Sequence, residues 1–184
     1  HRQVPINLER LSLAVSNTNQ RRELNESAYN DRVSDCQRAL EILKKVCDIS
    51  HLAELTPEML DQHESLFSQD LVPSRRARHI CEENARVRAA VPALDAGDSQ
   101  EFGRLMNASH DSLRDLFEVS SDPLNQLVRL AREQPTVLGS RLTGAGFGGC
   151  TVSLVPTEDV EKFQHLVGAS YTEATGLTAD FYLM

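Results

Sequence analysis

The stretch Gly139–Pro156, GSRLTGAGFGGCTVSLVP, holds five of the nine glycines in this 184-residue chain. It contains G-x-G-x-x-G at Gly144, Gly146 and Gly149, a spacing that occurs in dinucleotide-binding loops. Such a loop needs a helix after the glycines, because the pyrophosphate rests on the N-terminus of that helix. Residues 150–155, CTVSLV, predict a strand instead. The order of elements therefore excludes a Rossmann-type loop.

Two other phosphate-binding loops are excluded as well. A Walker A loop ends in Gly-Lys-Ser or Gly-Lys-Thr, whereas this loop ends in Gly148-Gly149-Cys150. A protein-kinase glycine loop must precede a strand lysine and a large second lobe, for which the chain after Gly149 is too short. Two interpretations stay open: a tight hairpin with a glycine bulge, which spacing alone favours, or a loop whose backbone approaches another backbone or a phosphate.

The sequence around the loop predicts the fold. Residues 137–142 and 150–155 indicate two strands joined by the loop, and Thr157 is expected to cap a helix that carries Val160, Phe163 and Val167. A last strand is expected at 180–184.

Upstream of the loop, one strand and several helices are expected. The strand covers residues 11–15 and ends in a polar turn. The helices are expected at 33–47 behind the caps Asn25 and Ser27, after Thr56-Pro57, at 75–91 with an unfavourably basic start, after Asp98 with Glu101, and from Asp122-Pro123 to before Pro135. Stripes of apolar residues, including Val33, Cys47, Ala77 and Val87, mark the buried faces of these helices. This order predicts an α+β fold with an antiparallel sheet and helices packed on one face.

Composition narrows the possible partners. The net charge of -8 and the pI near 5.2 argue against DNA or RNA. No apolar run approaches the roughly 20 residues that cross a bilayer, and no signal peptide opens the chain, so we expect a cytoplasmic protein without a membrane partner. The four cysteines are far apart and predict reduced thiols, and no histidine or cysteine spacing indicates a metal site. The start at His1 indicates a fragment or a processed piece.

Residues 138–150, LGSRLTGAGFGGC, resemble the third motif of the GHMP small-molecule kinases, in the form found in galactokinases. Three further islands follow in the order of that family: residues 15–36 with VSNTN, RR, SAY and Cys36, residues 76–80 with RARHI, and residues 102–115 with FGRLM and SHDSLRD. Together the four islands cover essentially the whole chain.

The resemblance implies that residues 1–184 form the ferredoxin-like C-terminal domain of a galactokinase, without its N-terminal domain. Such an enzyme transfers the γ-phosphate of ATP to the C1 hydroxyl of α-D-galactose. ATP and Mg²⁺ would be bound mainly by the N-terminal domain, which is the implied partner of this chain. The family's catalytic residues would lie upstream of position 1, so the chain alone is expected to be inactive.

The resemblance also assigns roles to residues of this chain. Tyr29 matches a tyrosine whose hydroxyl reaches the bound galactose, and Arg21 matches an arginine that supports charge on the transferred phosphoryl group. The nucleotide-proximal residues in and beside the loop would be Ser140, Thr143, Gly144, Gly146, Gly148 and Gly149. No metal ligand is expected in the chain.

Alternatives to a galactokinase domain stay open. One is a non-catalytic sugar sensor with the same fold, and another is a kinase for N-acetylgalactosamine or another GHMP sugar kinase. A third is an independent small-molecule binding domain. His110 and Asp111 could form a general-base pair, but a packing or surface histidine is favoured because Leu113 and Phe117 lie nearby on the same helix.

Overall fold

A computed structural model describes residues 4–5, 10–20 and 26–184. The elements follow in the order β1 (Leu11–Asn17), α1 (Glu26–Leu43), η1 (Leu52–Glu54), α2 (Pro57–Gln62), η2 (Glu64–Phe67), α3 (Leu71–Asp95), α4 (Ser99–Asp115), α5 (Asp122–Arg132), β2 (Gly139–Thr143), β3 (Cys150–Pro156), η3 (Thr157–Asp159), α6 (Val160–Thr175) and β4 (Asp180–Leu183). Within these ranges, no helix combines the length and the apolar composition that a membrane span requires.

The strands form one four-stranded antiparallel sheet in the order β2-β3-β1-β4. Strand β1 lies in the interior of the sheet and pairs with both β3 and β4, although it comes first in the chain. A β-α-β-β-α-β order with this arrangement is the ferredoxin-like topology. The predicted α+β class with an antiparallel sheet is therefore confirmed.

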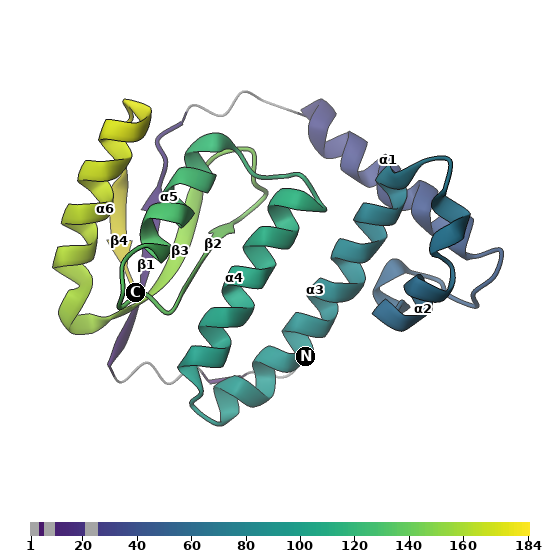
Figure 1. The fold of residues 1–184 in the computed structure, drawn as a ribbon, viewed down its shortest axis with the longest axis horizontal. Helices are drawn as coiled ribbons and strands as arrows, with labels where there is room; N and C mark the ends of the chain where they lie inside the picture. The colour runs from purple at the N-terminus through teal and green to yellow at the C-terminus, as the bar shows by residue number, and fades with distance from the viewer. Residues whose placement is uncertain (1–3, 6–9, 21–25) are drawn as a thin grey trace.

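Helices α5 and α6 cover one face of the sheet (Figure 1). Ala14 of β1 and Val155 of β3 point to this face because alternate residues of a strand share a side. They pack against Leu127 of α5 and Phe163 of α6. The buried hydroxyl of Tyr171 donates to the carbonyl oxygen of Thr18 at 2.9 Å, which satisfies the polar tip within this core.

A second core lies among the helices away from the sheet. Helices α1 and α3 pack together with α2 and the short 3₁₀ turns between them, as Figure 1 shows to the right of the sheet. Ala39 and Leu43 of α1 meet Ala77 and Cys81 of α3 in this core, and Leu55 is almost completely buried there. The two cores bury different faces of different elements.

Helix α4 joins the two parts, because it packs on β2 on one side and on α3 on the other (Figure 1). At Gly103 the contact between α4 and the sheet is made directly by backbone atoms. A Cβ atom added at Gly103 would overlap the carbonyl group of Leu138, and one added at Gly139 would overlap the backbone of Gly103. Only glycine permits this approach of helix to strand.

The helix predicted at 75–91 begins earlier than the sequence analysis indicated. It starts at Leu71, with the Asp70 carboxylate accepting from the backbone N–H of Val72 at 3.0 Å. Arg75 and Arg76 therefore lie beyond the first turn, where the helix dipole opposes a positive charge less. The basic start was a consequence of the misplaced boundary.

Three finer predictions were wrong. Val33 and Val87, assigned to buried faces, are 49% and 58% exposed, and each lines a pocket described below. Cys47 lies beyond the end of α1 at Leu43. Thr157 does not cap α6, because it begins the short turn η3 and its hydroxyl pairs with that of Ser12 at 3.0 Å. The predicted boundaries of the other helices and strands agree with the structure to within a few residues.

Replacing Gly103 by alanine tests the backbone contact between α4 and β2. We expect Gly103→Ala to lower the free energy of unfolding by about 2 to 3 kcal/mol, because the clash with Leu138 outweighs the gain in helix propensity. Urea unfolding measures the change. The matched control is Gly168→Ala in α6, whose Cβ would meet only the edge of the Phe181 ring at 3.2 Å, and we expect a change within about 1 kcal/mol there. Equal stability of the Gly103 variant and the parent would contradict the described packing.

Candidate functional site

The glycine loop, residues 144–149, connects β2 to β3 and is closed by the pair Thr143 and Cys150. Because strand β3 follows the loop directly, the exclusion of a Rossmann-type loop is confirmed. Gly144 and Gly146 have φ angles of 84° and 81°, a region that L side chains rarely adopt. Ala145 keeps a φ outside that region. The loop is thus a hairpin connection whose shape depends on its glycines.

The loop rests on the segment that follows α4. The backbone N–H of Phe147 donates to the carbonyl oxygen of Val119 at 2.7 Å, and a Cβ atom at Gly146 would overlap that same carbonyl group. Phe147 and Glu118 both have positive φ angles, 58° and 56°, although neither is glycine. One strained residue, Phe147, therefore donates this hydrogen bond, and the other, Glu118, precedes its acceptor, which indicates that the surrounding structure holds the contact in place.

The end of β1 lies beside the other end of the loop. The backbone N–H of Thr18 donates to the carbonyl oxygen of Gly149 at 2.9 Å, and Asn17 pairs with Cys150. The side chain of Gln20 accepts from the hydroxyl of Ser121 at 3.0 Å. Arg21, predicted to support the transferred phosphoryl group, lies outside the described residues.

Tyr29 and the glycine loop line the same pocket, which we call the loop pocket. It has a volume of about 440 Å³. Its lining comes from α1, from the end of α4 and the segment after it, and from the loop: Tyr29, Arg32, Val33, Cys36, Leu113, Phe117, Val119, Gly144, Ala145 and Phe147. The structure thus brings together Tyr29 and Gly144, which the sequence separates widely.

The polar groups of the loop pocket differ in their availability. Arg32 is already engaged, because its guanidinium donates to the carbonyl oxygens of Phe117 at 2.6 Å and Glu118 at 2.8 Å. Tyr29 is 61% exposed, and its hydroxyl makes no hydrogen bond within the described residues. The backbone N–H groups of Gly144 and Ala145 likewise meet no acceptor there. A phenol and free amides can bind hydroxyl or phosphate oxygens.

The other predicted loop residues are placed as follows. Thr143 and Gly144 are exposed, whereas Gly146 and Gly148 are buried against the molecule. Ser140 lies inside β2 and is fully buried, and its hydroxyl is 2.9 Å from that of Ser153. The Ser140 side chain is therefore shielded from any ligand that the loop could hold.

His110 lies in the protein interior. Its side chain is 1% exposed, and its Nδ1 atom accepts from the backbone N–H of Leu142 in β2 at 3.2 Å. Burial, together with the smaller effect of the nearby charge of Arg132, lowers its pKa to about 4. Asp111 instead forms ion pairs with Arg132 and Arg114. The structure thus confirms the packing interpretation over a general-base pair.

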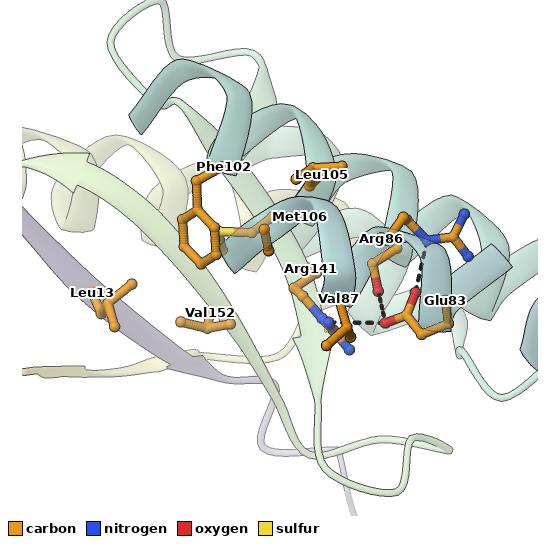
Figure 2. Close-up of a pocket in the computed structure, with 11 residues that line it drawn as sticks. Leu13, Glu83, Arg86, Val87, Phe102, Leu105, Met106, Arg141 and Val152 are labelled. Atoms are coloured by element: carbon orange, nitrogen blue, oxygen red, sulfur yellow. Dashed lines mark hydrogen bonds and ion pairs between the residues drawn. The ribbon is translucent and has the colours of Figure 1, made fainter. Parts of the chain in front are cut away.

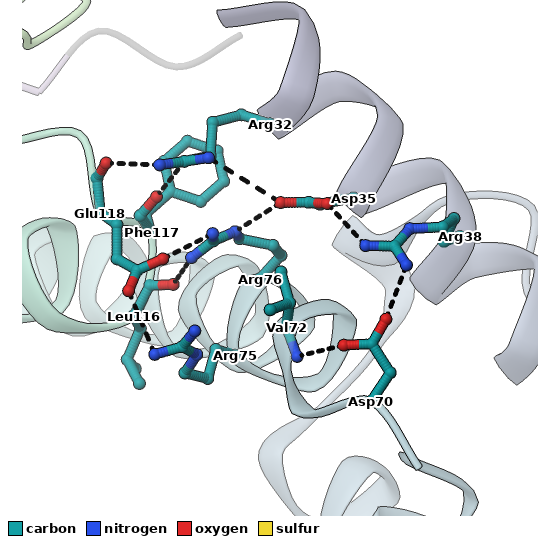
Figure 3. A network of polar contacts seen from close by, with 10 residues as sticks. All are labelled: Arg32, Asp35, Arg38, Asp70, Val72, Arg75, Arg76, Leu116, Phe117 and Glu118. Carbon is teal, nitrogen blue, oxygen red and sulfur yellow. Dashed lines mark hydrogen bonds and ion pairs between the residues drawn. The ribbon is translucent and has the colours of Figure 1, made fainter. Parts of the chain in front are cut away.

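A network of charged side chains adjoins the loop pocket, and the sequence did not predict it (Figure 3). Its centre is Arg76, which bonds to Asp35 and Glu118. Burial raises the pKa of Asp35, but hydrogen bonds from Arg38 and Arg76 outweigh it and hold the pKa below its usual value. A signal existed: Arg76, His79 and Glu83 are three and four residues apart, which places a polar stripe along α3.

A second pocket, of about 250 Å³, lies between α3, α4 and the sheet (Figure 2). Most of its lining is apolar and includes Leu13, Val152 and Phe102. Its charged groups bind one another, because Glu83 pairs with Arg86 at 2.8 Å and with Arg141 at 3.3 Å. It contains none of the residues that the sequence analysis assigned to a site.

The described residues contain no cluster of three histidine, cysteine, aspartate or glutamate side chains able to hold a metal ion. All four cysteines are free thiols. Burial raises the pKa of the Cys81 thiol to about 11, so that this side chain stays protonated in the helical core.

Comparison with known proteins gives a consistent result. Residues 90–172 match the family model described as GHMP kinases C terminal. The chain is 46% identical over 179 residues to a galactokinase of Enterococcus faecalis and 45% identical over 179 residues to one of Clostridium acetobutylicum. Each match covers 97% of this chain but 46% of the relative, so the chain spans about half the length of the curated relatives it matches.

Solved structures agree with these matches. A crystal structure of Lactococcus lactis galactokinase complexed with galactose is 41% identical, with a TM-score of 0.94, and the match covers 97% of this chain and 46% of that one. A mevalonate kinase of L. major, 24% identical with a TM-score of 0.60 over 100% of this chain and 44% of that one, shares the fold. The fold is that of a GHMP kinase C-terminal domain.

Alanine at Gly146 and at Gly144 separates the two demands on the glycine loop. Both positions have a left-handed φ, but a Cβ at Gly144 meets nothing within 4 Å, whereas one at Gly146 overlaps Val119. We expect Gly144→Ala to cost about 1 kcal/mol of stability and Gly146→Ala at least about 2 kcal/mol more, measured by urea unfolding. Equal losses would show that the loop does not rest on Val119.

The buried histidines predict a loss of stability in acid. The pKa values of His79 and His110 in the folded chain are about 4, below the value of about 6.5 in an unfolded chain. Between these values the unfolded chain binds more protons than the folded chain. The contribution of the two histidines to the free energy of unfolding is therefore complete above about pH 6.5 and is lost as the pH drops toward 4. Each histidine should contribute about 1 kcal/mol per pH unit in that window.

His110→Asn keeps an acceptor for the Leu142 N–H and removes the titrating group. We expect urea unfolding between pH 6.5 and 5 to show a shallower loss of stability than in the parent chain. The matched control is His165→Asn on the surface of α6, whose pH profile should overlay that of the parent. An unchanged profile for the His110 variant would contradict this assignment.

Proposed function

Because the chain has the fold of a GHMP kinase C-terminal domain and is homologous to galactokinases over nearly all of its length, we propose that it is the C-terminal domain of a galactokinase. The complete enzyme would transfer the γ-phosphate of ATP to the C1 hydroxyl of α-D-galactose. The observation that supports this proposal most directly is that Tyr29 and Gly144 line one pocket.

The loop pocket offers the two kinds of contact that such an enzyme needs from this domain. The hydroxyl of Tyr29, which makes no hydrogen bond within the described residues, can hydrogen-bond a hydroxyl of the sugar, and its rigid ring limits the entropy that is lost on binding. The amides of Gly144 and Ala145, which meet no acceptor in the described part of the chain, can approach a phosphate oxygen, because Gly144 has no side chain that stands in the way. Thr143, which is exposed beside Gly144, and Gly149 would complete the edge of this proposed site, whereas Gly148 is buried.

The remaining chemistry belongs to groups outside the described residues. We expect ATP and Mg²⁺ to be held mainly by an N-terminal domain, and the catalytic base to come from that domain as well. We assign Arg21 to the support of charge on the transferred phosphoryl group. A reducing, ATP-rich compartment such as the cytoplasm suits both the substrate and the four free thiols.

Phosphoryl transfer depends on the joint positioning of both reactants, so one wall of the site is not sufficient. We expect calorimetric titration of the 184-residue chain with galactose, and separately with MgATP, to show no binding. The longer protein from which we propose the chain derives should bind both and form galactose 1-phosphate. Formation of galactose 1-phosphate by the 184-residue chain alone would contradict the proposal that catalysis requires an N-terminal domain.

The same experiment separates the alternatives. Binding of galactose by the longer protein without phosphate transfer would indicate a sensor with this fold. Preferential formation of N-acetylgalactosamine 1-phosphate would indicate a kinase for that sugar. Tight binding of either ligand by the 184-residue chain would indicate an independent binding domain.

Tyr29→Phe tests the proposed sugar contact in the longer protein. Loss of one hydrogen bond from a phenol should lower kcat/KM for galactose by about threefold to tenfold and leave the KM for ATP unchanged. The matched control is Tyr182→Phe in the exposed part of β4, which should leave both constants unchanged. Full activity of the Tyr29 variant would remove this residue from the proposed sugar site.

A further inference from the structure

Arg76 of α3 is a buried arginine with three different acceptors. Its side chain is 2% exposed. Nε donates to Asp35 of α1 at 3.1 Å, Nη1 to the carbonyl oxygen of Leu116 at 2.5 Å, and Nη2 to the carboxylate of Glu118 at 2.6 Å (Figure 3). The planar guanidinium presents its donors in a fixed fork, so these bonds define the relative positions of α1, α3 and the segment after α4.

The segment held by Arg76 is the one on which the glycine loop rests. Glu118 is followed by Val119, whose carbonyl oxygen accepts from Phe147 in the loop at 2.7 Å. The positive φ of Glu118 costs conformational energy, and the ion pairs of its carboxylate with Arg76 and with Arg75 at 3.1 Å offset that cost. Arg76 is thus connected to the loop by its hydrogen bond to Glu118, by the peptide bond from Glu118 to Val119, and by the hydrogen bond between Val119 and Phe147.

The other end of the network reaches the helix that carries Tyr29. Asp35 lies on α1 less than two turns after Tyr29, and its carboxylate accepts from Arg76 and, at 2.8 Å, from Arg38. Arg32 of α1 also connects this helix to the segment after α4, because its guanidinium donates to the carbonyl oxygens of Phe117 and Glu118. The guanidinium of Arg76 therefore contacts α1, which carries Tyr29 on one wall of the loop pocket, and residues 116 and 118 of the segment that supports the glycine loop on the other wall.

We propose that Arg76 is a positioning residue that sets the separation between the Tyr29 helix and the glycine loop. This inference rests on the proposed function for its consequence in catalysis, but the positioning itself is a property of the described chain. Among the described residues, Arg76 forms no hydrogen bond with the loop and lines no part of the loop pocket, so its effect on the loop is transmitted there through Asp35, Leu116 and Glu118.

Arg76→Lys is the sharpest variant. A lysine ammonium keeps the positive charge but cannot reach the three acceptors in one plane. Each carboxylate keeps a second cation, Arg38 for Asp35 and Arg75 for Glu118, so the substitution leaves neither carboxylate without an ion pair. The chain should therefore stay folded while the fixed geometry is lost.

The matched control is Arg78→Lys on the same helix. Arg78 also forms an ion pair, with Asp61 of α2 at 2.6 Å, but that pair leads to the helical core rather than to residues 116–119. A general effect of weakening an arginine of α3 would appear in both variants.

Amide hydrogen exchange of the 184-residue chain measures positioning without any ligand. We expect Arg76→Lys to speed exchange about tenfold in peptides covering 116–119 and 144–149, and to leave the α5 peptide 124–131 unchanged. Arg78→Lys should change neither of the first two. Unchanged exchange at 144–149, or equal acceleration in all peptides, would overturn the proposal.

Glu118→Gln provides a second variant for the case in which Arg76→Lys does not fold. It weakens the same connection at a partly exposed carboxylate, and we expect exchange at 144–149 to rise about threefold. Unchanged exchange in this variant would likewise overturn the proposal.

Kinetics of the longer protein then test the consequence for the site. Arg76→Lys should raise the KM for galactose more than about fivefold, and should show a larger effect than Arg78→Lys. If the unsubstituted longer protein forms no galactose 1-phosphate, the proposed function fails, while the exchange result still decides whether Arg76 positions the loop.

Discussion

The buried guanidinium of Arg76 is the constraint on which the arrangement of this domain depends. It joins three acceptors that lie 40 to 42 residues away in sequence, on α1 and on the segment after α4. Removing a charge from water is costly, and the cost is recovered only when every acceptor is in place. The packing of α1, α3 and residues 116–118 is therefore coupled, and small displacements of one element are opposed by the others.

The coupling matters because the sheet and the helical core have separate hydrophobic interiors. Gly103 and Gly139 bring α4 against β2 by direct backbone contact, and the chain that leaves α4 then passes the Arg76 network before it reaches Val119. Val119 supports Phe147, so the glycine loop is held by the helical part of the domain as well as by its own strands. The outcome is a pocket with Tyr29 on one wall and the glycine loop on the other, which is the pocket that we propose as half of a sugar-kinase site.

Much of this fold could be predicted from local sequence. The hairpin around the glycine loop, the cap at Thr56 and the helix from Asp122 follow from spacing and turn chemistry within a few residues, and these are local effects. The misassigned faces were those of Val33 and Val87, because a stripe of apolar residues shows which side of a helix is apolar but not what covers it. Both valines line pockets instead of a closed core.

The site was predicted less completely for the same reason. The family resemblance pointed to Tyr29 and the loop, but the ion pairs of Asp35, Arg76 and Glu118 connect residues that only the folded chain brings together. Ser140 shows the reverse error. The glycine motif assigned it to the site because it lies three residues before Thr143, but the folded sheet buries its hydroxyl beside that of Ser153.

Backbone amide chemical shifts of this domain, recorded within the longer protein during titration with galactose, would show where the sugar binds. If the loop pocket is the sugar site, the shifts that change will cluster at residues 26–33 and 143–149, on its two walls. Changes that cluster instead around Leu13, Arg141 and Val152, at the second pocket, would contradict it.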